Sequence, residues 1–316
     1  ALSGLEVSNA SLYDGGSALA EACSMSLNIS NKNKILLSST INPNYVEVLK
    51  TYFSYRNVQI EFIDKESGVS KNNNKFNFSD FACVVIQSPN YYGLVENWKD
   101  WSNAINNNCV LICVSDPMSL SILESPGDCG ADIYCGEGQS LGNYMNFGGP
   151  FLGLLSSKMD YVRKMPGRIV GKTTDLNGED GYVLTLQARE QHIRRDRANS
   201  NICTNQSLMA LRASVYMSLL GKKGLSEISK ICFNKSQYAA RAISQIQGFE
   251  IPYGYNFIKE FVVKSRVASK KIIENALSEG ISISPLEGND NKLLIAITEK
   301  RTKEEIDFLV SFLKKQ

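Results

Sequence analysis

Short apolar runs recur along the first part of the chain, and most of them are separated by segments with helical periodicity. Within these runs neighbouring residues are apolar without polar alternation, as in "CVLICV" from Cys109 to Val114. Strands that are apolar on both faces and alternate with helices predict a parallel sheet covered on both sides. The predicted strands are residues 34–39, 58–64, 81–89, 109–117, 131–137 and 150–157. The pattern therefore indicates a doubly wound α/β core.

Helices are predicted between these strands, over residues 44–56 and 98–108. A first amphipathic helix is expected from Ser8 to about Ile29, entered through the glycine-rich turn "YDGG". Ser8 and Asn9 are the residue types that most often cap a helix at its start. We therefore expect the cap of the first helix at one of these two positions.

The pattern changes after Thr204, where helical segments predominate. Helices are predicted over residues 205–220, 224–246, 267–280 and 302–315, and strands over residues 257–265 and 292–299. This arrangement predicts a large domain over residues 1–204 and a small C-terminal α/β domain over residues 205–316. No linker rich in Pro or Ser separates them, so we expect a helix to join the two domains.

Charge and composition narrow the function classes. The chain has 316 residues, of which 43% are apolar, and 34 basic against 32 acidic residues give a net charge of +2. Such a balance disfavours a dedicated nucleic-acid binder. No apolar run reaches the roughly 20 residues that a membrane-spanning helix needs. The composition indicates a globular protein without a membrane segment.

The eight cysteines are scattered, form no CxxC pair and are accompanied by a single histidine, His192. A zinc site needs several such ligands at short spacing, so no metal is expected. Scattered cysteines with apolar neighbours are typical of core residues in a reducing compartment. A cytoplasmic location is the simplest expectation.

Three polar segments are predicted at the carboxyl ends of the parallel strands, where open α/β sheets bind ligands. They carry Asp116, Gln139 and the pair Gly15 and Gly16 at the start of the first helix. A glycine-rich helix start and a strand-terminal aspartate are typical of a pyridoxal-phosphate site, in which a lysine binds the cofactor covalently. Gln139 cannot form that bond, so the pocket is interpreted as vestigial. Asp116 before a proline is also common as a plain turn residue.

Four longer motifs resemble a known family: "NASLYDGGSALAEA", "GADIYCGEGQSLGNYMNFGGPFLG", "RKMPGRIVGKT" and "LTLQAREQHIRRDRANSNICTNQSLMAL". They are similar to subunit 1, the alpha chain, of the two-subunit glycine dehydrogenase (decarboxylating), the P-protein of the glycine cleavage system. The likeness is close from Leu2 to about Leu211 and holds only in outline beyond. It implies the pyridoxal-phosphate-dependent transferase fold, fold type I, which is aspartate aminotransferase-like. The family's alpha chains also carry an N-terminal segment that this sequence lacks.

The resemblance further implies a division of labour between two chains. Alpha chains of this family carry Gln where the homologous beta chain carries its pyridoxal-phosphate lysine, and Gln139 matches that position. The beta partner then holds the cofactor, and this chain is expected to be inactive alone. The complex decarboxylates glycine and passes the aminomethyl group to the lipoyl arm of H-protein. The alternatives are an autonomous aminotransferase or lyase-like enzyme, and a non-catalytic scaffold that retains the fold.

One segment concentrates cations around the only histidine, and it includes His192, Arg194, Arg195 and Asn201. It matches the family pattern "REQHIRRxKATSNICT" except at positions 197 and 199. Planar guanidinium groups suit buried or interfacial carboxylates, so we expect these residues at the interface with the beta chain. A solvated face, a phosphate patch or His192 as general base are the other interpretations. Ser200 or Asn201 is expected to cap the helix that follows.

Overall fold

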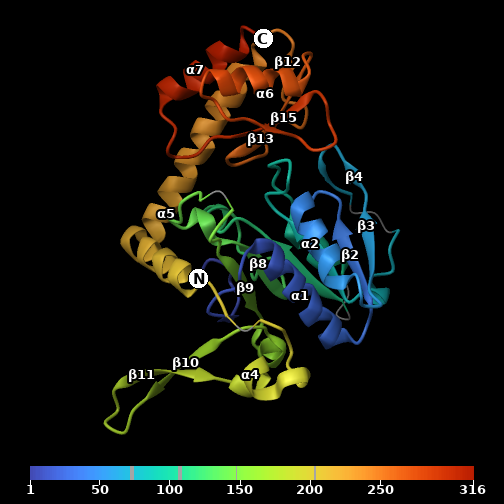
Figure 1. Ribbon diagram of the computed structural model, residues 1–316, viewed down its shortest axis with the longest axis vertical. Helices are drawn as coiled ribbons and strands as arrows, with labels where there is room; N and C mark the ends of the chain where they lie inside the picture. Colours follow the sequence, from blue (N-terminus) through green and yellow to red (C-terminus); the bar gives the residue numbers. More distant parts are fainter. Residues whose placement is uncertain (72–74, 106–108, 147, 203) are drawn as a thin grey trace.

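A computed structural model describes residues 1–71, 75–105, 109–146, 148–202 and 204–316 (Figure 1). Its centre is a seven-stranded sheet in the order β1-β9-β8-β7-β6-β2-β3. The pairs among β3, β2, β6, β7 and β8 are parallel, and β9 and β1 are antiparallel additions at one edge. The strands are β1 (Val7–Ser8), β2 (Lys34–Ser38), β3 (Gln59–Ile63), β6 (Cys83–Gln87), β7 (Val110–Val114), β8 (Ile133–Glu137) and β9 (Gly153–Ser157).

Both faces of this sheet are apolar, as the sequence pattern predicts. In β7, Ile112 belongs to the core cluster under α1 (Gly15–Ser30) and α2 (Pro43–Phe53). Its neighbours Leu111 and Cys113 belong to a second cluster on the other face, where Trp98 and Trp101 of α3 (Trp98–Ala104) pack. The predicted helix over 98–108 ends earlier, and residues 106–108 lie outside the described residues. Alternate side chains of one strand thus serve two cores.

Helix α1 begins later than the sequence suggested. Its N-cap is Asp14, whose carboxylate accepts the backbone N–H of Ser17 at 2.7 Å, so the prediction of Ser8 or Asn9 was wrong. Asp14 is favoured as the N-cap because the Ser17 hydroxyl also accepts the N–H of Asp14, which completes a capping box. The helix is buried on nearly every side rather than amphipathic, as expected of a helix in the middle of a large core.

The C-terminal part forms a separate antiparallel sheet in the order β12-β13-β15-β14. Its strands are β12 (Phe249–Glu250), β13 (Glu260–Ser265), β14 (Ser284–Pro285) and β15 (Lys292–Ala296). Helices α6 (Ser269–Ser278) and α7 (Lys303–Leu313) and the end of α5 share its core cluster. The sheet and its helices lie at one end of the molecule (Figure 1).

Helix α5 (Ser207–Ser244) connects the two sheets. Gly221 interrupts it with φ 61° and ψ −176°, which agrees with the two predicted helices separated near this position. Because the helix begins at Ser207 with Gln206 at its cap, the expectation that Ser200 or Asn201 caps it was wrong. Ser200 instead accepts the N–H of Ile202 within the preceding loop. The domain boundary at residue 204 stays a prediction.

A hairpin formed by β10 (Ile169–Thr174) and β11 (Asp180–Thr185) was not predicted from the sequence. The hairpin and α4 (Gln191–Arg194) project from the end of the molecule opposite the C-terminal sheet (Figure 1).

The remaining short elements are β4 (Lys65–Glu66), β5 (Val69–Ser70), η1 (Phe78–Asp80), η2 (Ser119–Ser121), η3 (Gly138–Ser140), η4 (Met159–Lys164), η5 (Gln187–Arg189) and η6 (Arg195–Arg197). Within the described ranges, no helix is both long enough and apolar enough to cross a membrane.

The loop after β6 packs tightly against the C-terminal sheet at Gly93. A Cβ atom at Gly93 would lie 1.9 Å from the carbonyl oxygen of Glu260, and the φ angle there is +85°. Gly178, at φ +83°, has no atom within 4 Å of such a Cβ. We expect Gly178→Ala to cost about 1 kcal/mol from backbone strain. Gly93→Ala should cost about 3 kcal/mol because a backbone clash is added. Urea denaturation of both variants measures this difference, and equal losses would contradict the tight contact.

Candidate functional site

A cavity of about 180 Å³ lies at the carboxyl ends of β6, β7 and β8, where the start of β13 closes it from the side of the C-terminal sheet. This is the edge at which open α/β sheets bind ligands. The predicted residues Asp116 and Gln139 both line it. The lining residues are Tyr45, Gln87, Pro89, Val114, Ser115, Asp116, Ser119, Glu137, Gln139, Ser140, Lys259 and Glu260.

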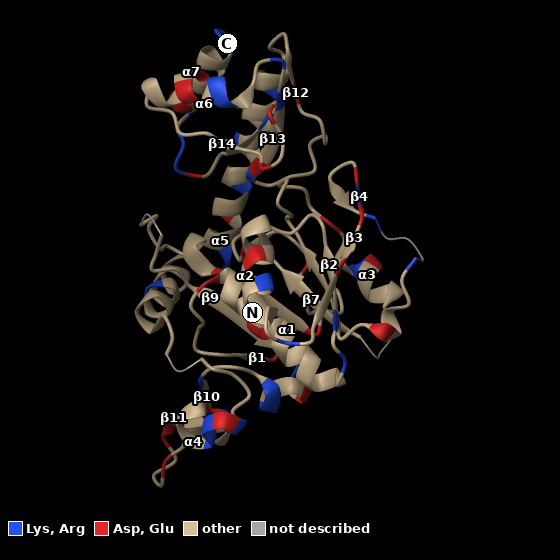
Figure 2. Ribbon diagram, turned by 45° about the vertical axis from the view of Figure 1, so that its right-hand side comes forward, with Lys and Arg blue, Asp and Glu red and all other residues tan. Residues whose placement is uncertain are grey.

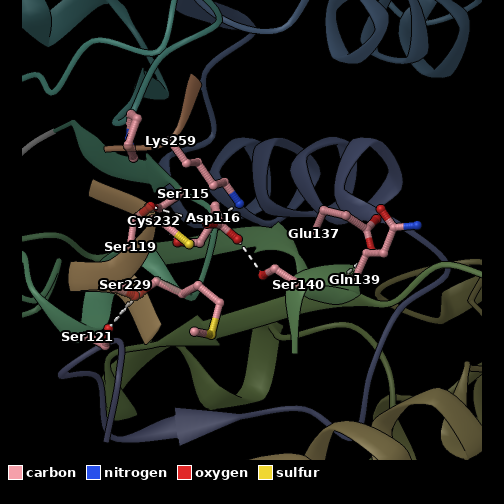
Figure 3. Close-up of polar contacts among 12 residues, drawn as sticks. Ser115, Asp116, Ser119, Ser121, Glu137, Gln139, Ser140, Ser229, Cys232 and Lys259 are labelled. Atoms are coloured by element: carbon pink, nitrogen blue, oxygen red, sulfur yellow. Dashed lines mark hydrogen bonds and ion pairs between the residues drawn. The ribbon is translucent and has the colours of Figure 1, made fainter. Parts of the chain in front are cut away.

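Asp116 follows β7 and binds the ammonium of Lys259 at 2.8 Å (Figure 3). Its other partners are the hydroxyls of Ser119, at 3.2 Å, and Ser140. Only about a fifth of the Asp116 and Lys259 side chains is exposed, at 22% and 21%. Burial alone would raise the pKa of Asp116, but Lys259 and the two hydroxyls hold that pKa below its ordinary value. Asp116 is therefore an ionised carboxylate with every partner already in place.

Glu137 ends β8 and lies against the start of α1. Its Oε2 accepts the N–H of Gly15 at 2.9 Å, and its Oε1 accepts the N–H of Gln139 at 3.1 Å and of Leu152 at 2.8 Å. Burial raises the pKa of Glu137, and the three N–H donors act against that rise. A carboxylate of this chain thus occupies the positive end of the α1 dipole.

The other predicted residues surround Glu137. The Gln139 amide donates to the carbonyl oxygen of Tyr144 at 3.3 Å, and Figure 3 shows the side chain beside Glu137. The hydroxyl of Tyr45 lies so close to Gly15 that a Cβ there would be 2.2 Å from it. A Cβ on Gly16 would be 3.2 Å from Val48. A side chain at Gly15 would therefore displace Tyr45, whereas one at Gly16 would need only a small shift of its neighbours.

The cavity is acidic. Its ionisable lining consists of three carboxylates, Asp116, Glu137 and Glu260, against the one ammonium of Lys259 and the phenol of Tyr45. Burial would lower the pKa of Lys259, but Asp116 and Glu260 raise it above its ordinary value. Burial raises the pKa of Glu260, and Lys259 opposes that rise. The potential inside therefore favours cations over anions.

These residues do not fit pyridoxal phosphate. Position 139 is a neutral amide, which cannot form an imine. The Gly15 N–H, which could bind a phosphate at the start of α1, already donates to Glu137. The Glu137 carboxylate would also repel a phosphate dianion at this position. The Asp116 carboxylate, which would face a pyridinium nitrogen, is paired with Lys259. No step through the cofactor can be assigned to this cavity.

The predicted interface residues lie elsewhere. His192 and Arg194 are on α4, Arg195 follows it, and none of them lines the cavity (Figure 1). The side chain of His192 is 54% exposed and its Nδ1 lies 3.8 Å from a carboxylate oxygen of Glu190. Asn201 is exposed as well. This segment lies beside the hairpin, at the end of the molecule opposite the C-terminal sheet.

Arg189 differs from its neighbours because it is buried at 7% exposure. Its guanidinium donates to the carbonyl oxygens of Met165 and Gly167 and of Leu186, which fixes the base of the β10–β11 hairpin. Figure 2 shows basic and acidic segments side by side around α4. Glu190 and Asp196 stand among the arginines of this segment, which weakens the case for nucleic acid.

Sequence reasoning missed Glu137, Tyr45 and Lys259. Glu137 could have been found, because it stands at a strand end directly before Gln139. Lys259 could not, because it comes from a different sheet and 143 positions of chain separate it from Asp116 (259 − 116). Among the described side chains, no group of three or more His, Cys, Asp or Glu could hold a metal ion.

Comparison with known proteins decides the family. The model of the family "Glycine cleavage system P-protein" matches residues 1–313. A "probable glycine dehydrogenase (decarboxylating) subunit 1" of Desulforamulus reducens is 44% identical over 324 aligned residues, which cover 99% of this chain and 72% of that protein. The chain belongs to the glycine cleavage system P-protein family. The resemblance noted in the sequence motifs is thereby confirmed.

Solved structures agree with this assignment. The crystal structure of a glycine decarboxylase (P-protein) in inhibitor-bound form superposes with a TM-score of 0.95 at 34% identity, covering 99% of this chain and 72% of that one. A NifS-like protein superposes with a TM-score of 0.69 at 13% identity, covering 98% of this chain and 81% of that one. At this identity the likeness supports a shared fold and nothing more. The prediction of a fold type I, mostly parallel α/β architecture is confirmed.

The ion pair at the P-protein cavity gives a prediction with a defined pH dependence. Lys259→Met leaves the carboxylate of Asp116 without its cation, and we expect a loss of about 3 kcal/mol at neutral pH. Because the folded pKa of Asp116 is lowered and that of Lys259 raised, the pair stabilises fully between about pH 4 and pH 10. Its contribution is lost as the pH falls through the lowered pKa of Asp116, so the two proteins should converge in acid.

Lys264→Met is the matched control. Lys264 lies on β13, which begins directly after Lys259, and its 3.1 Å ion pair with Glu250 is largely exposed, at 43% and 64%. We expect a loss of at most about 1 kcal/mol from this change. Urea denaturation across the pH range measures both effects. Equal and pH-independent losses would contradict the role of the buried pair.

Proposed function

We propose that this chain is subunit 1 of a two-subunit glycine dehydrogenase (decarboxylating) and works only together with a second subunit that binds pyridoxal phosphate. The second subunit would use the cofactor to decarboxylate glycine, and the complex would pass the aminomethyl group to the lipoyl arm of H-protein. One observation carries the proposal: in a chain of the P-protein family, the cavity has Gln139 in place of a lysine and Glu137 at the helix start.

The contribution of this chain would then be structural support of the partner at a shared interface. The segment with His192, Arg194, Arg195 and Asn201 is exposed, and within the described residues neither arginine forms an ion pair with a carboxylate. Beside it, the hairpin exposes large apolar side chains, which a two-stranded hairpin without cover rarely retains. They are Val170, Tyr182, Val183 and Leu184. These features support an interface at this end of the molecule.

The same observations weigh against the alternatives. An autonomous aminotransferase or lyase-like enzyme would need a lysine in its cavity that can bind the cofactor. Lys259 lines the cavity but is held by Asp116. A cytoplasmic location remains part of the proposal, and it is supported by the seven described cysteines, which are all free and buried.

The interface role predicts a separation between assembly and folding. Arg194→Ala and Arg195→Ala should each weaken association with the second subunit by about 2 kcal/mol or more, roughly 30-fold in the dissociation constant. The melting temperature of the isolated chain should stay unchanged, because both side chains are exposed. Arg189→Ala should instead lower that melting temperature, because its buried guanidinium binds three carbonyl oxygens.

Association is measured by titrating the second subunit, and function by exchange of the glycine carboxylate with bicarbonate in the complex. Arg241→Ala, an exposed arginine near the end of α5, is the control and should change neither. Normal assembly and full exchange with both the Arg194 and the Arg195 variant would refute the interface and leave this segment as a solvated surface.

A further inference from the structure

We infer that this chain carries its own substitutes for a cofactor: the Glu137 carboxylate fills the anion position at the start of α1, and the Lys259 ammonium takes the Asp116 carboxylate. The cavity is thereby a structural centre that rejects phosphate-bearing ligands. This inference concerns the isolated chain, so it can fail or hold independently of the proposed subunit role.

The geometry around Glu137 is that of an anion held by backbone donors. N–H groups from three separate segments, Gly15, Gln139 and Leu152, converge on its two oxygens at 2.8 to 3.1 Å. A helix start provides such donors together with a favourable dipole, and phosphate groups commonly use them. Here a side chain of β8 makes the bonds, so the donors remain satisfied without any ligand.

Space and charge both oppose a competing anion. The Tyr45 hydroxyl lies against Gly15 on the cavity side, and Tyr45 and Glu137 both line the cavity. A phosphate entering here would have to displace Glu137 and would then lie close to the carboxylates of Asp116 and Glu260, which carry charge of the same sign. Glu137 therefore excludes phosphate by occupying the position and by its charge.

Lys259 completes the arrangement from the other sheet. It reaches across the cavity from the start of β13, and Figure 3 shows its ammonium pointing at Asp116 while Ser140 approaches from the other side. The carboxylate is thus satisfied on both oxygens, Oδ1 by Ser140 and Oδ2 by Ser119 and Lys259. A ring nitrogen that needed Asp116 would have to break an existing ion pair.

Phosphate rescue tests the first half of the inference. Glu137→Ala removes the carboxylate and leaves the three N–H groups unpaired, so we expect its melting temperature to fall by roughly 5 °C or more. Inorganic phosphate should raise that melting temperature more than it raises the wild type's, against sodium chloride of equal ionic strength. Glu47→Ala removes an exposed glutamate of α2, 69% exposed, and should behave as the wild type in both salts.

Three results would overturn the inference. They are a Glu137→Ala protein with the melting temperature of the wild type, a phosphate response equal to that of the wild type, and saturable phosphate binding by the wild type itself. Should the alanine variant fail to fold, Glu137→Gln keeps the shape and removes the charge. It should melt below the wild type, and a melting temperature equal to the wild type's would contradict the role of the charge.

Restoring the lysine tests the second half. In Gln139→Lys the imine-forming group is back, but Glu137 and Lys259 remain. After incubation with pyridoxal phosphate, borohydride reduction and peptide mapping, we expect no more label at the substituted position than at surface lysines. Specific labelling of that position with Glu137 and Lys259 intact would show that the cavity accepts the cofactor and would overturn the inference.

Discussion

The ion pair between Asp116 and Lys259 is the interaction on which the arrangement of the two sheets depends. Asp116 follows strand β7 of the large sheet and Lys259 directly precedes strand β13 of the C-terminal one, so their 2.8 Å contact joins the two sheets at the cavity. Gly93 and the bridge between Leu94 and Phe257 bring the backbones together around this point. Buried ion pairs often give little net stability, but breaking one is costly, which suits a contact that selects a single arrangement.

Two parts of the molecule differ in how their polar groups are satisfied: the cavity at the strand ends and the hairpin at the far end. At the strand ends, Glu137 and Lys259 satisfy the groups that would otherwise bind a cofactor. At the far end, the β10–β11 hairpin exposes apolar side chains and the neighbouring α4 and η6 expose arginines. The buried Arg189 binds backbone carbonyls at the base of the hairpin. We propose that this exposed arm contacts the partner subunit.

Most strands and helices could be predicted from local sequence patterns, because burial on both faces leaves unbroken apolar runs such as "CVLICV". The pocket residues Asp116 and Gln139 were also within reach, since strand ends follow from the strands. Lys259 was not, because pairing across two sheets leaves no local signal. The hairpin was missed because its strands are largely exposed and show no buried face. The α1 cap was missed because Ser8, Asn9 and Asp14 are all residue types that cap helices.

The division of labour is tested most directly by locating the cofactor in the assembled complex. This chain and the second subunit are purified together, reduced with borohydride in the presence of pyridoxal phosphate, digested and mapped by mass spectrometry. The account predicts one stoichiometric pyridoxyl-lysine per pair of chains, on a peptide of the second subunit. A stoichiometric pyridoxyl-lysine on a peptide of this chain, at Lys259 or elsewhere, would contradict it.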